Sequence, residues 1–322
     1  MQSVRRGFTL VELVAVLTTT ATVSALCIAS RQPAFGKSKQ SVDALSSART
    51  TAQRLKDQSQ IRVIVQGFTV WASMNGDRYP LPSALDSENT TVADLGRAKD
   101  TTADVFSIFL FNGSFSPETC VSPSEINPAI KVNATFEYAN PHLAVKPASA
   151  SWDPGFSADF TKGIGNVSYA HLETSGQPRT EKRELSGRWR RWGSTKVPTD
   201  ALLGNRGPEI ESVTVGGDGT LGKQYAAKAK KPDSNAFKVH GKDGVWGGNI
   251  GFNDGHVDSL TGLGPPADRD ARTWATYTTK DGAKRLDTLF YDEPDDAAQD
   301  NLFLGIFTRA GASPKDFTAI WD

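Results

Sequence analysis

The first 30 residues constrain this chain most, because a short basic leader is followed by a long apolar run that carries one carboxylate. Arg5 and Arg6 belong to the leader, and residues 8–30 contain a single charged side chain, Glu12. As a helix, these 23 residues span roughly 35 Å, enough to cross a hydrocarbon core of about 30 Å. A charge inside such a span costs about 2.5–3.5 kcal/mol, so Glu12 is expected to have a function.

The residues around the start of the run form a motif, Arg6-Gly7-Phe8-Thr9-Leu10-Val11-Glu12-Leu13. This string resembles the processing motif of type IV prepilins and type II secretion pseudopilins. The resemblance implies that a prepilin peptidase cuts after Gly7 and methylates the new amino-terminal Phe8. It also implies that Glu12 neutralises the terminal ammonium of a neighbouring subunit during assembly. Such pairing makes both charges less costly in lipid.

Other interpretations of this segment stay open. A plain membrane anchor would not need Glu12. A secretory signal peptide has a similar basic start, and Arg5-Arg6 fits part of a twin-arginine signal. The run is longer than a signal-peptide core, and no Ala-x-Ala cleavage site follows it. Lipoprotein processing at Cys27 is disfavoured, because Leu26 is too bulky for the usual recognition site.

The net charge and the cysteine content limit which partners and which disulfides are expected. The chain of 322 residues carries 36 basic and 36 acidic side chains, so no overall charge favours nucleic acid as a partner. There are two cysteines, and Cys27 falls in the predicted membrane span. Cys120 therefore has no partner for a disulfide outside the membrane.

Residues 31–78 are predicted to continue the N-terminal helix as an amphipathic helix, with an interruption at Pro33. Arg49, Arg54, Lys56, Asp57 and Arg62 are expected on its polar faces. The helix is expected to end near Asn75-Gly76-Asp77 and to pack one apolar side against a sheet. The apolar residues recur at helical spacing: Val42, Leu45, Ala48, Ala52, Leu55, Ile61, Ile64, Val65, Phe68, Trp71 and Ala72.

Four further segments, residues 58–80, 118–125, 166–170 and 249–257, carry a second resemblance. They are similar to pilin-like proteins abundant in planctomycetes and related bacteria, which have a processing-associated domain of the H-X9-DG type. In that pattern a His lies nine residues before Asp-Gly, whereas 13 residues separate His240 from Asp254.

We therefore expect an α+β fold, with a long N-terminal helix packed on an antiparallel sheet that carries large loop insertions. The predicted organisation is a leader (1–7), a transmembrane and assembly helix (8–30), its amphipathic continuation (31–78) and a β-rich head (79–322). Asp-Gly pairs at Asp218, Asp243, Asp254 and Asp281 predict turns, with a two-residue hairpin turn at Asp254-Gly255. Residues 105–111 and 301–307 are apolar runs that fit a helix or a strand.

Two groups of residues are candidates for metal binding. His240, Asp254, His256 and Asp258 carry imidazole and carboxylate ligands, although a hydrogen-bonded hairpin explains the same residues. The acidic stretch with Asp292, Asp295 and Asp296 offers the oxygen ligands that Ca²⁺ prefers, and a solvated acidic turn is the alternative. No cofactor other than calcium is indicated.

Cations and aromatic rings alternate in Arg188-Trp189-Arg190-Arg191-Trp192. This pattern is typical of grooves that bind single-stranded nucleic acid, and it also fits adhesion to a sugar or another surface. Alternating cation–π packing on a surface strand is the simpler interpretation.

No nucleophile motif, phosphate loop or catalytic carboxylate pair is recognisable, so the chain is not expected to be an enzyme. The resemblance implies a pilin or pseudopilin subunit of the bacterial inner membrane, with a single span and a head in the periplasm or on the cell surface. The alternative is a membrane-anchored module that binds a polysaccharide, protein or DNA. An anchored hydrolase using His240, His256 and Asp254 is a third class.

Overall fold

The computed structural model of the chain describes residues 39–176, 187–194, 197–217 and 222–322. Two compact units divide the chain, residues 1–50 and 51–322. Helix α2 (Lys39–Met74) begins in the first unit, and its residues 51–74 belong to the second unit together with every described strand. The predicted leader and the predicted assembly helix, residues 1–30, lie outside the described residues.

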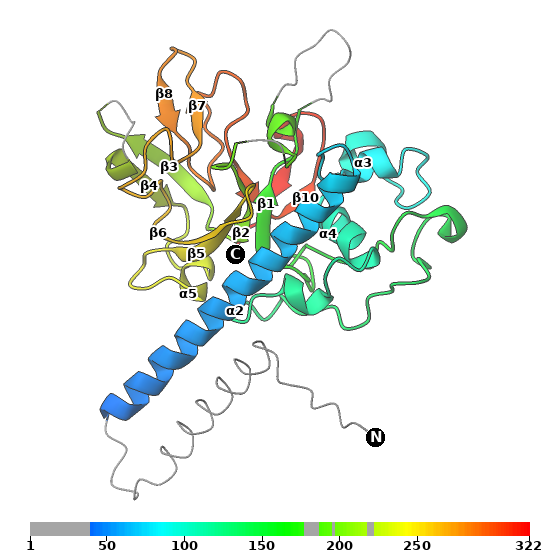
Figure 1. The fold of residues 1–322 in the computed structure, drawn as a ribbon, viewed down its shortest axis with the longest axis horizontal. Coiled ribbons are helices and arrows are strands. Elements are labelled where there is room, and N and C mark those ends of the chain that lie inside the picture. Colours follow the sequence, from blue (N-terminus) through cyan, green and yellow to red (C-terminus); the bar gives the residue numbers. More distant parts are fainter. Residues whose placement is uncertain (1–38, 177–186, 195–196, 218–221) are drawn as a thin grey trace, which may run out of the picture. The chain divides into compact units, whose positions relative to one another are not determined.

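The second unit is built on a five-stranded antiparallel sheet with the strand order β6-β5-β2-β1-β9 (Figure 1). Every residue of the three central strands is buried, so both faces of the sheet are covered. The strands are β1 (Tyr169–Leu172), β2 (Ala201–Asn205), β5 (Gly247–Phe252), β6 (Val257–Thr261) and β9 (Leu304–Gly305).

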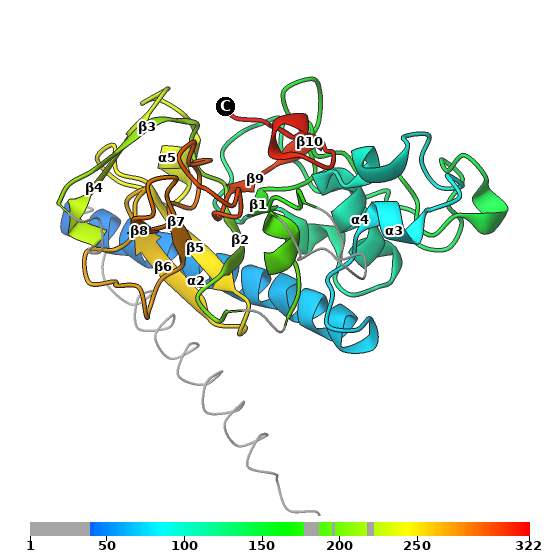
Figure 2. The same cartoon turned by 90° about the horizontal axis from the view of Figure 1, so that it is seen from above.

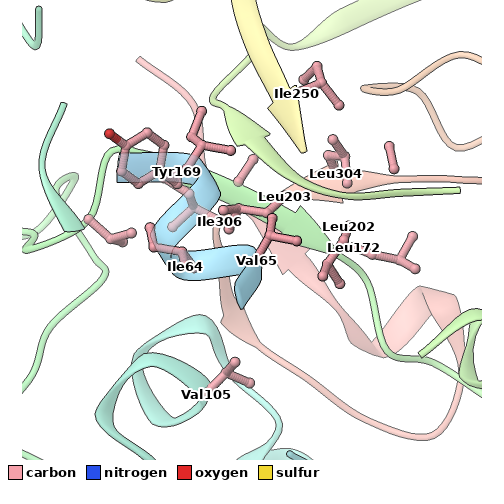
Figure 3. Packing of buried hydrophobic residues seen from close by; sticks show 14 of the residues in the cluster. Ile64, Val65, Val105, Tyr169, Leu172, Leu202, Leu203, Ile250, Leu304 and Ile306 are labelled. Carbon is pink, nitrogen blue, oxygen red and sulfur yellow. The ribbon is translucent and has the colours of Figure 1, made fainter. Parts of the chain in front are cut away.

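Helix α2 runs along one face of this sheet (Figures 1 and 2). Its inner side presents apolar residues three or four positions apart, and these are fully buried: Ile61, Ile64, Val65, Phe68 and Ala72. Figure 3 shows Ile64 and Val65 pointing into a core that also holds Leu203 and Ile250 from the sheet. The close approach depends on Gly251, since a Cβ there would lie 2.6 Å from Val65 Cγ2.

The predicted end of this helix is confirmed, but its buried face differs from the prediction. The helix ends at Met74, and Gly76 and Asp77 follow in left-handed conformations with φ of 63° and 62°. Leu55, expected on the apolar side, is 61% exposed. Asp57, expected on a polar face, is completely buried. The turn that carries Asp57 therefore belongs to the face that contacts the sheet.

The two ambiguous apolar runs adopt different structures. Residues 105–111 lie in helix α4 (Thr102–Phe111), where Thr101 caps the first turn by accepting a hydrogen bond from the backbone N–H of Asp104. The ring of Phe109 on this helix lies 4.4 Å from that of Phe68 on α2. Residues 301–307 instead contribute β9 and the start of β10 (Phe307–Arg309).

The rest of the described chain forms three hairpins and short helical turns. The hairpins are β3 (Ile210–Val215) with β4 (Tyr225–Ala229), β7 (Thr276–Thr278) with β8 (Lys284–Leu286), and β10 with β11 (Thr318–Ala319). The α-helical turns are α3 (Pro82–Leu85) and α5 (Ala236–Val239). The 3-10 turns are η1 (Gly96–Lys99), η2 (Pro117–Cys120), η3 (Pro147–Ser149), η4 (Arg188–Arg191), η5 (Gly222–Gln224) and η6 (Pro314–Asp316).

The Asp-Gly turns are of two kinds. At Asp243-Gly244 both residues have positive φ, 54° and 77°, as a two-residue turn requires. At Asp254-Gly255 only the glycine does, and four residues connect β5 to β6, so the predicted two-residue turn there is wrong. Asp218 lies outside the described residues.

The fold class is α+β, as predicted, with helices α2 and α4 beside antiparallel sheets. Within the described ranges, no helix combines the length and apolar character needed to cross a bilayer.

Candidate functional site

A buried carboxylate on α2 connects the helix to three adjacent strands of the sheet. Asp57 Oδ1 accepts hydrogen bonds from Tyr169 Oη on β1 at 3.0 Å and from Asn205 Nδ2 on β2 at 3.2 Å. Asp57 Oδ2 accepts one from Asn249 Nδ2 on β5 at 2.7 Å. We call these four residues and His240 the Asp57 cluster. It fixes the helix in one register on the sheet, because each donor comes from a different strand.

The donors of the Asp57 cluster are themselves held in place. The backbone N–H of Asn249 donates to Asn205 Oδ1 at 2.7 Å, and Ser259 Oγ donates to Asn249 Oδ1 at 2.5 Å. Burial by itself raises the pKa of Asp57, but His240, Ser122 and Asn249 outweigh it and hold the pKa below its ordinary value. Asp57 is therefore a buried carboxylate that stays ionised.

His240 contacts Asp57 rather than the hairpin tip. Its Nε2 lies 3.1 Å from Asp57 Oδ2, but outside hydrogen-bond geometry, and neither ring nitrogen has a hydrogen-bond partner among the described residues. His240 does not join the other candidate metal ligands, Asp254, His256 and Asp258, because it lies beside Gly247 at the start of β5, whereas those residues follow the other end of that strand.

Three of the four segments that carry the second resemblance contact one another around α2. Gln60 Nε2 donates to the carbonyl of Glu118 at 2.7 Å, and the backbone N–H of Ser168 donates to the carbonyl of Cys120 at 2.9 Å. The fourth, residues 249–257, is joined to α2 through Asn249 and through Gln58, whose Nε2 donates to the carbonyl of Val257 at 3.1 Å. Cys120 itself is a buried free thiol.

The tip of the β5–β6 hairpin carries the other members of that predicted metal group. His256 Nδ1 contacts Asp254 Oδ1, and its Nε2 lies 3.8 Å from Asp258 Oδ2. Arg269 Nη2 donates to Asp258 Oδ2 at 2.7 Å, so this carboxylate already has a cationic partner. In the part of the chain that the structure describes, no group of three or more His, Cys, Asp or Glu side chains is arranged to hold a metal ion.

The Arg-Trp string is not a surface strand. It forms the 3-10 turn η4, in which Arg188, Trp189 and Arg191 are buried, and Trp192 follows with no exposed surface. The Trp189 ring is contacted by cations from outside the string, Arg78 at 5.0 Å and Arg97 at 5.5 Å from its centroid. The interpretation as an exposed cation–π ladder is therefore wrong.

The buried arginines of η4 are held by carboxylates from other segments of the chain. Arg188 Nη1 donates to Glu173 Oε2 at 2.7 Å, and its Nη2 donates to Asp292. Arg191 Nη1 donates to Asp200 Oδ1 at 2.5 Å. We call these five residues, with Arg190, Asp287, Glu293 and Asp300, the arginine cluster. Its two buried guanidiniums are occupied inside the protein and are not available to a nucleic acid.

Two of the three residues predicted to offer calcium ligands, Asp292 and Asp296, have partners within the protein. Asp292 pairs with Arg188, and Asp296 accepts hydrogen bonds from the backbone N–H groups of Ala298, Asp300 and Asn301. Asp296 is only 2% exposed, so the stretch is not a fully solvated turn. Asp295 is exposed.

Carboxylates outnumber cations in the arginine cluster, and burial raises the pKa of four of them, Glu173, Asp200, Asp287 and Glu293. Burial raises the pKa of Asp287 to about 8, against the lowering effect of Arg191. Burial, together with the neighbouring Asp287, raises the pKa of Glu293 far above its ordinary value. One oxygen of the Asp287 carboxylate, Oδ1, is buried without a hydrogen-bond partner among the described residues.

The processing and assembly residues predicted from the sequence, Gly7, Phe8 and Glu12, lie outside the described residues. The helical spacing of the sequence also places Asp57 on the buried face of the helix, because it stands four residues before Ile61 and seven before Ile64.

Comparison with family models, curated proteins and solved structures finds no match to this chain.

Proposed function

We propose that this chain is a pilin-like or pseudopilin subunit, processed by a prepilin peptidase and assembled through its N-terminal helix into a type IV pilus or a type II secretion pseudopilus. The observation that carries the proposal is the string of residues 6–13, in which a cleavage glycine, a mature-terminal phenylalanine and a carboxylate stand at the spacing of the prepilin motif. In this proposal the protein is a single-pass component of the bacterial inner membrane, and its head is periplasmic or on the surface.

The architecture of residues 51–322 supports this proposal. In a subunit whose N-terminal helix packs in a filament, the head must be rigidly attached to that helix if it is to have a fixed place in the filament. Helix α2 has the required attachment, because Asp57 hydrogen-bonds three neighbouring strands and Gly251 lets the helix backbone approach the sheet closely. The segments that resemble planctomycete-type pilin-like proteins meet around the same part of α2.

Replacing Glu12 by Ala in a host with a prepilin peptidase and an assembly system tests the proposal. We expect normal cleavage and loss of sheared filaments, because the subunit ammonium at Phe8 would lack its counter-charge. Thr18→Ala is the matched control, since it removes a polar group from the same segment without removing a charge. Filaments of normal yield from the Glu12 variant would contradict the charge-pairing role.

A membrane-anchored binding module is the second candidate function. It is favoured by the amount of chain outside the sheet, since the hairpins β3–β4 and β7–β8 form small sheets of their own and border hollows at the surface. In this alternative the N-terminus serves only for export and anchoring. Shearing cells that produce the full chain separates the two candidates, because a filament subunit is recovered in the sheared fraction and an anchored module stays with the membrane.

A further inference from the structure

A hollow of about 350 Å³ lies between the hairpins β3–β4 and β7–β8 and the loop after β8. Figure 1 shows these two hairpins close together in the same part of the head. Val213 and Val215 of β3 form one wall, and Tyr277 of β7 and Arg285 of β8 form another. The volume is at the lower end of the range typical of small-molecule sites, about 300–1,000 Å³.

Several polar side chains of this hollow have unused hydrogen-bonding capacity. Tyr277, Tyr291, Arg285 and Asp295 all line it. None of their side chains has a hydrogen-bond or ion-pair partner among the residues that the structure describes, and Arg285 Nη1 is buried in that state. Leaving a buried guanidinium nitrogen unpaired costs free energy, so a group that supplies an acceptor to Arg285 would be stabilised there.

The remaining acid of the hollow is part of its wall. Glu293 Oε1 accepts a hydrogen bond from the backbone N–H of Thr288 at 3.1 Å, and its Oε2 accepts one from Asn301 Nδ2 at 2.5 Å. These internal donors hold the carboxyl group in place. The groups left for a ligand are therefore two phenol hydroxyls, one guanidinium and one exposed carboxylate.

This set of groups selects a neutral ligand that carries both donors and acceptors. An anion would be attracted by Arg285 but would also lie beside Asp295 and the Glu293 carboxyl group, which disfavour it. A cation would be repelled by Arg285. A sugar ring offers hydroxyls to all of these groups, and its C–H face packs well on aromatic rings such as Tyr291. We infer that this hollow binds one neutral saccharide unit of an oligosaccharide or polysaccharide. The inference concerns the head alone, and it is independent of whether the chain assembles into filaments.

The other hollows do not offer the same combination. The hollow lined by Arg190, Arg191 and Trp274 has its guanidiniums paired with Asp300 and Asp200. The hollow between Phe237 and Pro266 is mostly apolar, and nothing in the structure indicates what would cover it.

Calorimetric titration of the full chain tests the inference, in a detergent without a sugar headgroup. The probes are cellotetraose, maltotetraose, mannotetraose and xylotetraose, with tetragalacturonate as the charged counterpart. We expect saturable binding of at least one neutral tetrasaccharide. Tyr291→Ala and Arg285→Gln are each expected to weaken it about tenfold, which corresponds to about 1.4 kcal/mol.

Lys284→Gln is the matched control, because Lys284 precedes Arg285 on β8 but lines a different hollow. Its affinity should equal that of the unmodified chain. Tyr291→Phe and Asp295→Asn keep the test valid if Tyr291→Ala does not fold, since both retain side-chain shape and should still weaken binding. Absence of saturable binding by all four neutral probes, binding of tetragalacturonate alone, or unchanged affinity in these variants would overturn the inference.

Discussion

The Asp57 cluster and the arginine cluster both bury charged groups, but they compensate the charge in opposite ways. Around Asp57, hydroxyl and amide donors from three strands bind one carboxylate, and although burial raises its pKa, His240, Ser122 and Asn249 outweigh burial and hold the pKa below the ordinary value. Around Arg188 and Arg191, carboxylates are in excess, and burial raises the pKa of Asp287 to about 8. The first cluster therefore keeps a buried carboxylate charged, and the second keeps one protonated at neutral pH.

The difference follows from what each cluster connects. The Asp57 cluster joins a helix to strands whose backbones are already paired, so side-chain amides and a phenol can be aimed at one point. The arginine cluster joins η4 to loops, and long guanidinium side chains can reach acceptors there that regular structure does not supply. Arg188, for example, also donates from Nε to the backbone carbonyl of Asn301 at 2.7 Å.

The largest loss of stability is expected for Arg188→Met, which leaves Glu173 buried without its cationic partner. Removing one side of a buried ion pair costs about 3–5 kcal/mol in free energy of unfolding. Arg190→Met is the matched control in the same turn, because the Arg190 side chain is 51% exposed and its pair with Asp300 is expected to contribute at most about 1 kcal/mol. Chemical denaturation of the full chain measures both, and equal losses would contradict the distinction.

Asp57→Asn should destabilise the protein by about 1–3 kcal/mol, because the new amide donor would face the amide of Asn249 without an acceptor. The shape of the side chain is retained, so the loss reports on hydrogen bonding rather than on volume. Asp268→Asn changes an exposed carboxylate in the same way and should alter stability by less than about 0.5 kcal/mol. A neutral effect of Asp57→Asn would show that the cluster does not hold the helix on the sheet.

Gly251→Ala tests the close approach between α2 and the sheet. Its Cβ would lie 2.6 Å from Val65 Cγ2, and Val65 is branched and fully buried, so the helix must shift. Overpacking of this kind costs about 1–3 kcal/mol. Gly163→Ala is the control, because no atom lies within 4 Å of the added methyl group. Thermal or chemical unfolding compares the two, and similar stabilities would contradict the tight contact.

The two clusters should also give opposite slopes of stability against pH. Asp287 binds its proton in the folded state up to about pH 8, whereas its unfolded value is 3.8. Its contribution is present below pH 3.8 and is lost as the pH rises toward 8, by at most about 1.4 kcal/mol per pH unit. Asp57, with a lowered pKa, contributes stability that is present above its unfolded value and is lost as the pH falls through the folded value.

Asp287→Asn removes the titrating group of the arginine cluster while retaining its shape. The variant should lose less stability than the unmodified chain when the pH is raised from 5 to 8. Denaturation curves at several pH values provide the measurement. A slope identical to that of the unmodified chain would exclude Asp287 as the source of the pH dependence.

The sequence predicted those parts of the fold that depend on local patterns. The end of α2 followed from Asn75-Gly76-Asp77, and the turn at Asp243-Gly244 followed from the ease with which these residues adopt positive φ. The α+β class followed from the helical repeat of residues 31–78, from the Asp-Gly turns after it and from the resemblance to pilin-like proteins. The sequence of residues 105–111 fitted either a helix or a strand. In the structure this segment is a helix, capped by Thr101 and largely buried.

The clusters were not predictable in the same way, because their partners are distant in the sequence. Arg188 is held by Asp292 and Asn301, more than 100 residues later, so its neighbours in the sequence suggested an exposed ladder. His240 was compared with the nearby hairpin, although its partner, Asp57, lies on α2. In both cases the tertiary structure brings a buried polar side chain against a carboxylate that no local pattern reveals.

The most direct test of the proposed function is the intact mass and N-terminal sequence of the full chain, extracted from membranes after co-expression with a prepilin peptidase. The account predicts a mature chain that begins at N-methylated Phe8 and lacks residues 1–7. A chain that retains Met1, or one that is cut after the apolar run of residues 8–30, would contradict it.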